Sequence, residues 1–229
     1  IGWNIGTCPN FEVGTCNGAI AGCADVGACL QCIGESAVDQ AIALYYDALV
    51  DTDPKAQTVL NKCQQTIGKE AAKFYQAKSK ALQKCWDAVN KDKVAGPCPS
   101  PGDGKAVAAI AKAEGKVIGA TCKACGGADK RCDADVTAPS GQRVAGSGGA
   151  DDLTAAQIGF PAGCDAVTAP GGPACGAAVT TLADLVQCVA CVSEFKADCV
   201  DRAAVPGLTS YPPECNGATP TPTPTATPT

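Results

Sequence analysis

Cysteines constrain the fold of this chain most, because 17 of its 229 residues are cysteine, whereas none is Met or His. The aromatic residues number only two Trp, four Tyr and four Phe, so bulky apolar packing is scarce. A disulfide contributes about 2–4 kcal/mol to stability and persists in oxidising compartments. We therefore predict eight intrachain disulfides, one odd thiol, and a secreted, extracellular or periplasmic protein.

The cysteines follow an internal repeat. The stretches "CNGAIAGCADVGACLQC" at 16–32 and "CGAAVTTLADLVQCVAC" at 175–191 align without a gap. The alignment pairs Cys16 with Cys175, Cys29 with Cys188 and Cys32 with Cys191, and a small length change also pairs Cys8 with Cys164. Matching cysteines should take matching partners. Cys23 faces Leu182 in this alignment, which makes Cys23 the candidate for the odd or intermolecular thiol.

The repeat suggests five segments in a mainly α, disulfide-rich fold with little β structure. Two homologous small helical modules would flank a helical hairpin. The segments are a first Cys-rich module at 1–53, a disulfide-closed hairpin at 54–133, a Gly/Ser-rich connector at 134–157, a second Cys-rich module at 158–216, and a Thr/Pro-rich tail at 217–229. Helical periodicity predicts a helix over 181–203, and a comparable first-copy helix that reaches Leu49, in one piece or in two around Gly34.

Apolar positions three and four residues apart predict one long helix from Pro54 to Val89 and a second over 104–122. Cys63 and Cys85 lie 22 residues apart, about 33 Å along a helix, so they cannot bridge each other. We therefore predict a Cys85–Cys98 bridge near the turn. A Cys63–Cys122 bridge would close the open end of the hairpin.

Charge is segregated along the chain, which carries −7 over 1–53, +8 over 54–133 and −6 over 134–229. Acidic ends could dock on the basic middle, within a molecule or between molecules. The simpler interpretation is that the lysines solvate an exposed helical face. An acidic pI of about 4.7 argues against nucleic acid as a partner. Without an apolar run of about 20 residues, we expect no membrane span.

Three CxxC pairs are the main candidates for metal or redox chemistry: Cys29/Cys32, Cys122/Cys125 and Cys188/Cys191. Thiolates alone could hold zinc or an iron–sulfur cluster, and a thioredoxin-like pair is a further alternative. In a helix, however, positions i and i+3 share a face, which favours disulfides. Without His the usual triads are unavailable, so we predict no enzyme, no cofactor and no metal site. The recurring Asp25 and Asp184 are expected to cap helices.

The tail alternates threonine with mostly proline. Its threonines are Thr219, Thr221, Thr223, Thr225, Thr227 and Thr229. In an extended strand nearly all backbone donors of such a segment face one side, which suits docking on a neighbour by strand addition. The alternative is a polyproline spacer with O-linked glycans on the threonines.

The motifs "CQQTIGK", "KALQKC" and "CGGADK" resemble a group of uncharacterised cysteine-rich secreted proteins of environmental bacteria. The resemblance implies secretion and disulfides and brings no activity with it. We expect a secreted structural protein, a homopolymeric subunit of an extracellular fibre or surface assembly, joined through its terminal modules and tail. The alternative is a secreted lipid-binding, small-molecule-binding or adhesive module.

Overall fold

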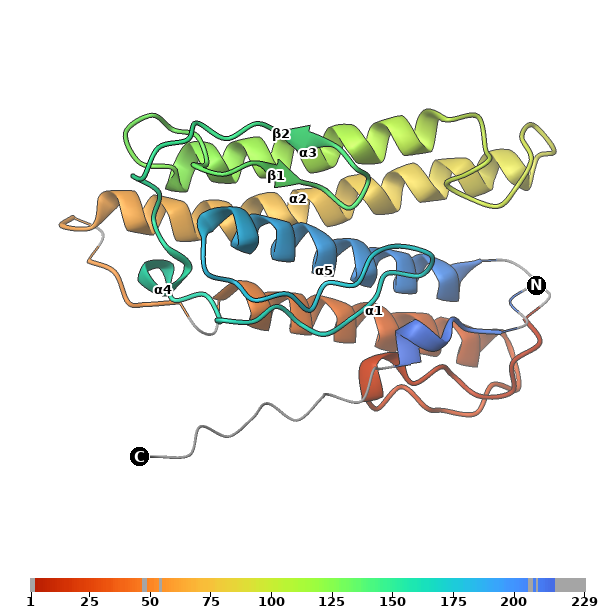
Figure 1. Cartoon of the computed structure of the whole chain (residues 1–229). Helices are drawn as coiled ribbons and strands as arrows, with labels where there is room; N and C mark the ends of the chain where they lie inside the picture. Colours follow the sequence, from red (N-terminus) through yellow and green to blue (C-terminus); the bar gives the residue numbers. More distant parts are fainter. Residues whose placement is uncertain (1–2, 47–48, 54, 206–207, 209, 217–229) are drawn as a thin grey trace.

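Four long helices dominate the computed structural model, which describes residues 3–46, 49–53, 55–205, 208 and 210–216. They are α1 (Cys23–Tyr46), α2 (Thr58–Val89), α3 (Lys105–Cys125) and α5 (Leu182–Ala204). Successive long helices run in opposite directions (Figure 1). The protein is therefore mainly α, as predicted, and takes the form of an up-and-down bundle.

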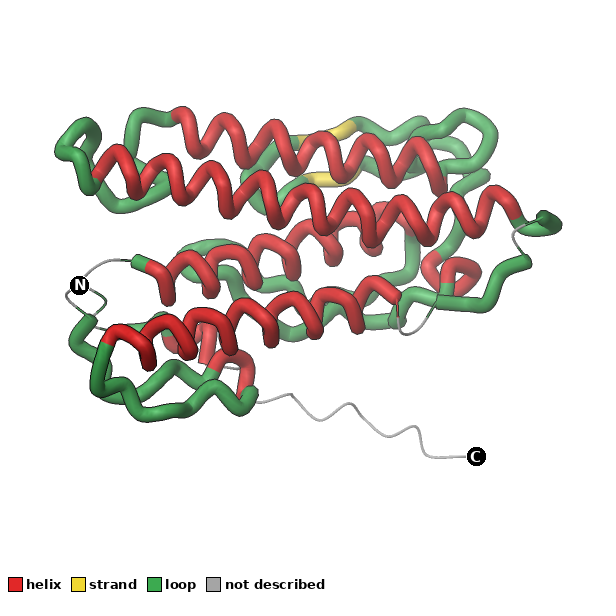
Figure 2. Tube along the Cα trace, turned by 180° about the vertical axis from the view of Figure 1, so that it is seen from behind, coloured by secondary structure: helices red, strands yellow, loops and turns green. Residues whose placement is uncertain are grey.

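Helix α5 is the centre of this bundle and packs against α1, α2 and α3. It lies between α1 and the α2–α3 hairpin in both views (Figures 1 and 2). Buried residues occupy most of its circumference, and the remaining partly exposed side carries Gln187, Glu194 and Asp198. Its start is defined by a capping box between Thr181 and Asp184.

Helices α2 and α3 form the predicted hairpin, joined by a turn that contains Pro97, Pro99 and Pro101. Helix α2 begins at Thr58, later than predicted. Helix α1 is a single helix that runs through Gly34 and ends at Tyr46. Its outward-facing apolar residues weaken the amphipathic pattern on which the expected boundaries depended.

One apolar core joins segments that the sequence suggested were separate. It contains Leu44 of α1, Ile67 of α2, Ile118 of α3 and Leu185 of α5. Two smaller clusters lie within the hairpin and between α1, the N-terminal loop and α5. The bundle therefore depends on both copies of the repeat and on the hairpin together.

The predicted connector at 134–157 also contributes to this core. It contains the antiparallel strands β1 (Val136–Thr137) and β2 (Arg143–Val144), with Val136 opposite Val144. The short helix α4 (Ala155–Ile158) begins at its end. Val136 is fully buried, so this segment is a packed element despite its Gly-rich composition.

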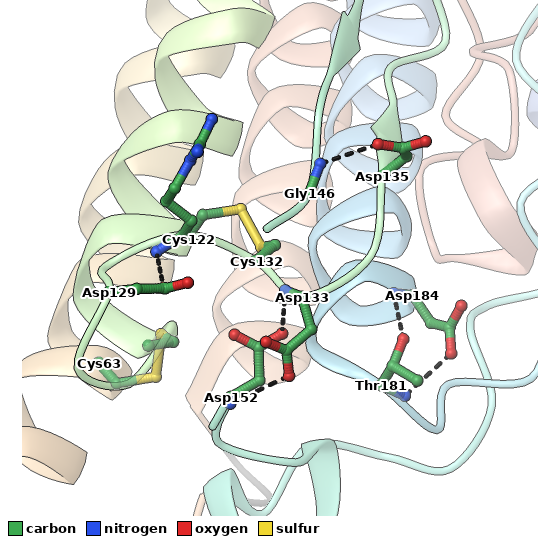
Figure 3. Close-up of a disulfide and its surroundings, with 12 residues drawn as sticks. Cys63, Cys122, Asp129, Cys132, Asp133, Asp135, Gly146, Asp152, Thr181 and Asp184 are labelled. Carbon is green, nitrogen blue, oxygen red and sulfur yellow. Dashed lines mark hydrogen bonds between the residues drawn. A yellow bond between two sulfur atoms is a disulfide. The ribbon is translucent and has the colours of Figure 1, made fainter. Parts of the chain in front are cut away.

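The hairpin bridges correct one of the two predictions. Cys85 is bonded to Cys98 at the turn, as predicted. The predicted Cys63–Cys122 bridge is wrong, because Cys63 is bonded to Cys125. Cys122 is instead bonded to Cys132, where the chain folds back after α3 (Figure 3). Cys122 and Cys125 are separated by less than one helical turn, so helix length alone does not decide which of them meets Cys63.

The two Cys-rich stretches have the same disulfide pattern. Cys8–Cys29 and Cys16–Cys32 in the first copy correspond to Cys164–Cys188 and Cys175–Cys191 in the second. Each copy also has one isolated β-bridge at equivalent positions, Thr7 with Ala19 and Gly163 with Ala178. The second copy has an additional disulfide, Cys199–Cys215. The local structure therefore repeats along with the sequence.

Candidate functional site

Asp25 and Asp184 lie at the starts of α1 and α5 and perform the same task. The Asp25 carboxylate accepts hydrogen bonds from the backbone N–H groups of Ala21 and Gly22, both at 2.9 Å. Asp184 accepts the equivalent bonds from Thr180 at 3.1 Å and from Thr181 at 2.9 Å, the second of which is drawn in Figure 3. These hydrogen bonds hold the pKa of Asp184 below its usual range although burial opposes them. Both residues are helix caps.

A second carboxylate pair, Asp133 and Asp152, ties the two ends of the segment after α3 together. Each backbone N–H donates to the other carboxylate, at 2.8 and 3.2 Å (Figure 3). Desolvation, and then the negative charge of Asp133, raise the pKa of Asp152 to about 6. Among the described residues, no group of three or more acidic, Cys or His side chains has the geometry of a metal site.

The interface between α2 and α5 contains a buried lysine. Lys78 is 2% exposed, and its Nζ lies 2.8 Å from Glu194 Oε1 and 2.8 Å from Asp198 Oδ1. Burial raises the pKa of Asp198 to about 6, although Lys78 opposes that shift. Because a buried charge must be paired, the acid pair of α5 fixes α2 against it.

Glu114 of α3 faces the same cluster and is fully buried. Burial, and then the negative charge of Glu194, raise its pKa to about 7. Ser140 from the connector donates a hydrogen bond to Glu114 and opposes this shift. The cluster therefore places three carboxyl groups around one lysine.

Lys196 on α5 makes the corresponding connection to the first copy. Its Nζ lies 2.6 Å from Glu12 and 2.8 Å from Gln40, and it sits over the ring of Phe11 at 5.7 Å. It is 1% exposed. Sequence periodicity offered a signal for both buried lysines, because each stands at a position where the helical pattern requires an apolar residue.

The acid pair of α5 has a counterpart in α1. The gapless alignment places Glu35 opposite Glu194 and Asp39 opposite Asp198. Glu35 and Asp39 are both exposed, and Glu35 accepts a hydrogen bond from Gln31 on its own helix. The first copy thus repeats the acid pair but presents it to solvent.

Two apolar side chains lie beside this exposed acid pair. Val38 is 45% and Ile42 is 49% exposed. At 100° per residue the four side chains fall within about 100° of each other, on the side of α1 opposite four of its five buried positions, the exception being Tyr45. We call these four residues the α1 ridge: Glu35, Val38, Asp39 and Ile42.

A groove of ≈ 400 Å³ runs between α2 and α3. We call it the lysine groove, and its residues include Lys73, Lys112 and Lys116 as well as Phe74, Ala113 and Val117. The three lysines are exposed, whereas the other three side chains are buried and form an apolar floor. Lys73 is paired with Glu70 at 2.6 Å, which leaves Lys112 and Lys116 as the cations of α3 at this groove.

The remaining predicted site residues are separate from these surfaces. Cys23 is exposed and has no disulfide partner within the described residues. The six tail threonines lie outside the described residues. No helix in the described part of the chain has both the length and the apolar character to cross a membrane. Comparison of the whole chain with family models, curated proteins and solved structures finds no match.

Proposed function

We propose that this protein is a secreted structural subunit that assembles with copies of itself into an extracellular fibre or surface layer. One observation carries the proposal: the acid pair of the first repeat copy is exposed beside apolar side chains, whereas its half-buried counterpart in the second copy is paired with a buried lysine. An exposed apolar patch with a charged border is typical of a protein-binding surface.

The distribution of charge supports self-association over binding to an unrelated partner. Helix α1 carries three acids and no base, whereas α3 carries four lysines and one acid. These helices lie on opposite sides of α5 (Figure 1). Two different, complementary surfaces on opposite sides of one molecule generate open-ended assembly when the contact does not close into a ring.

The eight bridges also support a role outside the cell. They fit an oxidising compartment, and they stabilise a bundle whose core contains few large aromatic side chains. A subunit exposed to dilution and proteases benefits from bridges that limit unfolding.

Electron microscopy and sedimentation of the oxidised full-length chain test this proposal. We expect regular polymers at low ionic strength, and fewer as salt screens the contacts between charged surfaces. A chain that remains monomeric at every concentration and salt level would contradict a structural role.

The tail has a separate proposed role, because its Thr/Pro alternation suits one-sided strand addition to a neighbouring subunit. Deletion of residues 217–229 should then weaken assembly without changing the stability of the bundle. If the amount and length of the polymers do not change after this deletion, the docking role of the tail is wrong. The tail would then be a spacer with O-glycans on its threonines.

One observation favours a second candidate function, the binding of a small apolar molecule. A groove of ≈ 680 Å³ lies between α2 and α5 and includes Tyr75, Trp86 and Val200. Mass spectrometry of the purified protein under native conditions would detect a retained ligand. A bound molecule that is lost after Trp86→Ala, in a chain that stays monomeric, would favour this function over assembly.

A further inference from the structure

We propose that the α1 ridge of one molecule docks in the lysine groove of a second copy of this chain. This inference rests on the proposed function and specifies the contact that would join the subunits. It commits to a second copy as the occupant because the two surfaces are complementary in charge, in apolar character and in spacing.

The chain already makes a contact of this kind within one molecule. In α5, a Glu and an Asp four residues apart hold the ammonium group of Lys78, each at 2.8 Å. In α1, Glu35 and Asp39 have the same residue types at the same spacing and lie in solvent. The first copy therefore retains a lysine-binding pair for which this molecule supplies no lysine among the described residues.

Helix α3 supplies matching cations at the lysine groove. Lys112 and Lys116 are exposed on α3 and lie four residues apart, as Glu35 and Asp39 do on α1. Four residues span about 6 Å along a helix, so two helices packed side by side can bring both acid–lysine pairs together. Isolated surface ion pairs contribute little to binding, and these pairs would mainly set the orientation and partner of the contact.

Apolar side chains lie beside the charges on both surfaces. Val38 and Ile42 project between and beyond the two acids, whereas Phe74, Ala113 and Val117 form the floor of the lysine groove. Ridges of one helix packing into the groove between two others follow the ordinary geometry of helix packing. Phe74 and Val117 are only 1% and 2% exposed, so the binding free energy would come mainly from burial of Val38 and Ile42, at about 25 cal/mol per Å².

The arrangement also explains why the contact forms between molecules. The four side chains of the α1 ridge are exposed, and α5 separates α1 from α3 in both views (Figures 1 and 2). A molecule cannot fold its own ridge into its own groove without breaking the bundle. Each molecule would offer one ridge and one groove, which is a head-to-tail contact.

Charge reversal on each surface tests the inference. The first variant carries Glu35→Lys and Asp39→Lys, and the second carries Lys112→Glu and Lys116→Glu. We expect each to raise the protein concentration at which polymers form, measured by pelleting and electron microscopy, about tenfold or more, which corresponds to about 1.4 kcal/mol or more. A mixture of the two variants in equal amounts should regain polymers. Each ridge–groove contact between different variants again pairs opposite charges.

Matched controls reverse exposed charges away from both surfaces, at Asp51 and Asp87 for the acids and at Lys91 and Lys93 for the lysines. These variants should assemble like the wild type, and circular dichroism and intact mass should show that all variants are helical with eight bridges. If both test variants polymerise as the wild type does, this contact is wrong and the proposed function stands. The same conclusion follows if the wild type polymerises and the mixture of the two variants stays monomeric. A monomeric wild type overturns both.

Discussion

Helices α1 and α5 have equivalent places in the repeat alignment, but they differ in how they pack in the bundle. Helix α5 has neighbours on three sides and hides its acid pair on Lys78. Helix α1 packs on one side and leaves the equivalent acids, with Val38 and Ile42, in solvent. The difference teaches that position in the bundle decides whether a repeated acid pair is a structural contact or an available surface.

The largest expected effect concerns the buried member of this comparison. Replacement Lys78→Met should destabilise the bundle by about 3 kcal/mol, because it leaves the half-buried Glu194 and Asp198 without their cation. The exposed Lys80→Met is the matched control and should change stability by less than about 0.5 kcal/mol. Chemical unfolding with the disulfides intact measures both.

The exposed acid pair should respond differently in the same assay. The combined change of Glu35→Gln and Asp39→Asn should leave the unfolding free energy of the monomer within about 0.5 kcal/mol of the wild type. Equal destabilisation by this change and by Lys78→Met would show that the two acid pairs do not differ in role.

Equivalent disulfides sharpen the comparison at the next level. Cys16–Cys32 and Cys175–Cys191 both span 16 residues, so the chain-entropy model assigns the same stabilisation to each, about 3 kcal/mol. Replacing both cysteines by Ala should nevertheless cost more in the second copy, because Cys175 and Cys191 lie in the main core and their removal leaves a cavity. Thermal unfolding of the two double variants compares them. A larger loss in the first copy would contradict the central position of α5.

The pH dependence of stability should depend on α5 and its neighbours. The pKa of Glu114 is raised from 4.5 to about 7, so between these values the folded chain binds more protons than the unfolded chain. Its stability should therefore fall as pH rises through this window, and Asp198 acts in the same direction with a pKa of about 6. Glu114→Gln should flatten the dependence and gain about 1 kcal/mol at pH 8. If the unfolding midpoint changes with pH as steeply in the Glu114→Gln variant as in the wild type, a buried, protonated Glu114 would be contradicted.

The comparison of the two copies also extends to the helix starts. Thr181→Ala removes the hydroxyl that accepts the Asp184 N–H bond at 3.1 Å, and should cost about 1 kcal/mol. In the first copy Gly22 directly precedes α1, and an added Cβ there meets no atom within 4 Å. Gly22→Thr should therefore gain a few tenths of a kcal/mol. A loss at Gly22 would show that the two starts differ beyond this one side chain.

Sequence patterns alone predicted the helical hairpin, the repeat alignment and the Cys85–Cys98 bridge. They did so because each depends on local spacing: apolar periodicity, matched cysteines and a short loop with three prolines. The partner of Cys63 was missed because Cys122 and Cys125 share one helical face, and only the register of α2 against α3 selects between them.

The candidate site was predicted less well, because its residues are distinguished by their exposure in the folded bundle. Glu35 and Glu194 have equivalent places in the alignment, yet one is exposed and the other is bound to Lys78. Both expected uses of the basic segment also occur in one helix, since Lys78 docks on acids while Lys80 faces solvent. Tertiary packing, which local sequence does not specify, makes this distinction.

The central claim is that the acid pair of α5 binds a lysine within the molecule, whereas the equivalent pair of α1 binds lysines of a second copy. Zero-length carbodiimide coupling of carboxyl groups to lysines tests this claim most directly. Polymers formed from equal amounts of ¹⁴N- and ¹⁵N-labelled chains are coupled, digested and analysed by mass spectrometry. The account predicts mixed-isotope links that join Glu35 or Asp39 to Lys112 or Lys116, and single-isotope links between Lys78 and Glu194 or Asp198. Polymers in which Glu35 and Asp39 link to no lysine of a second chain would contradict it.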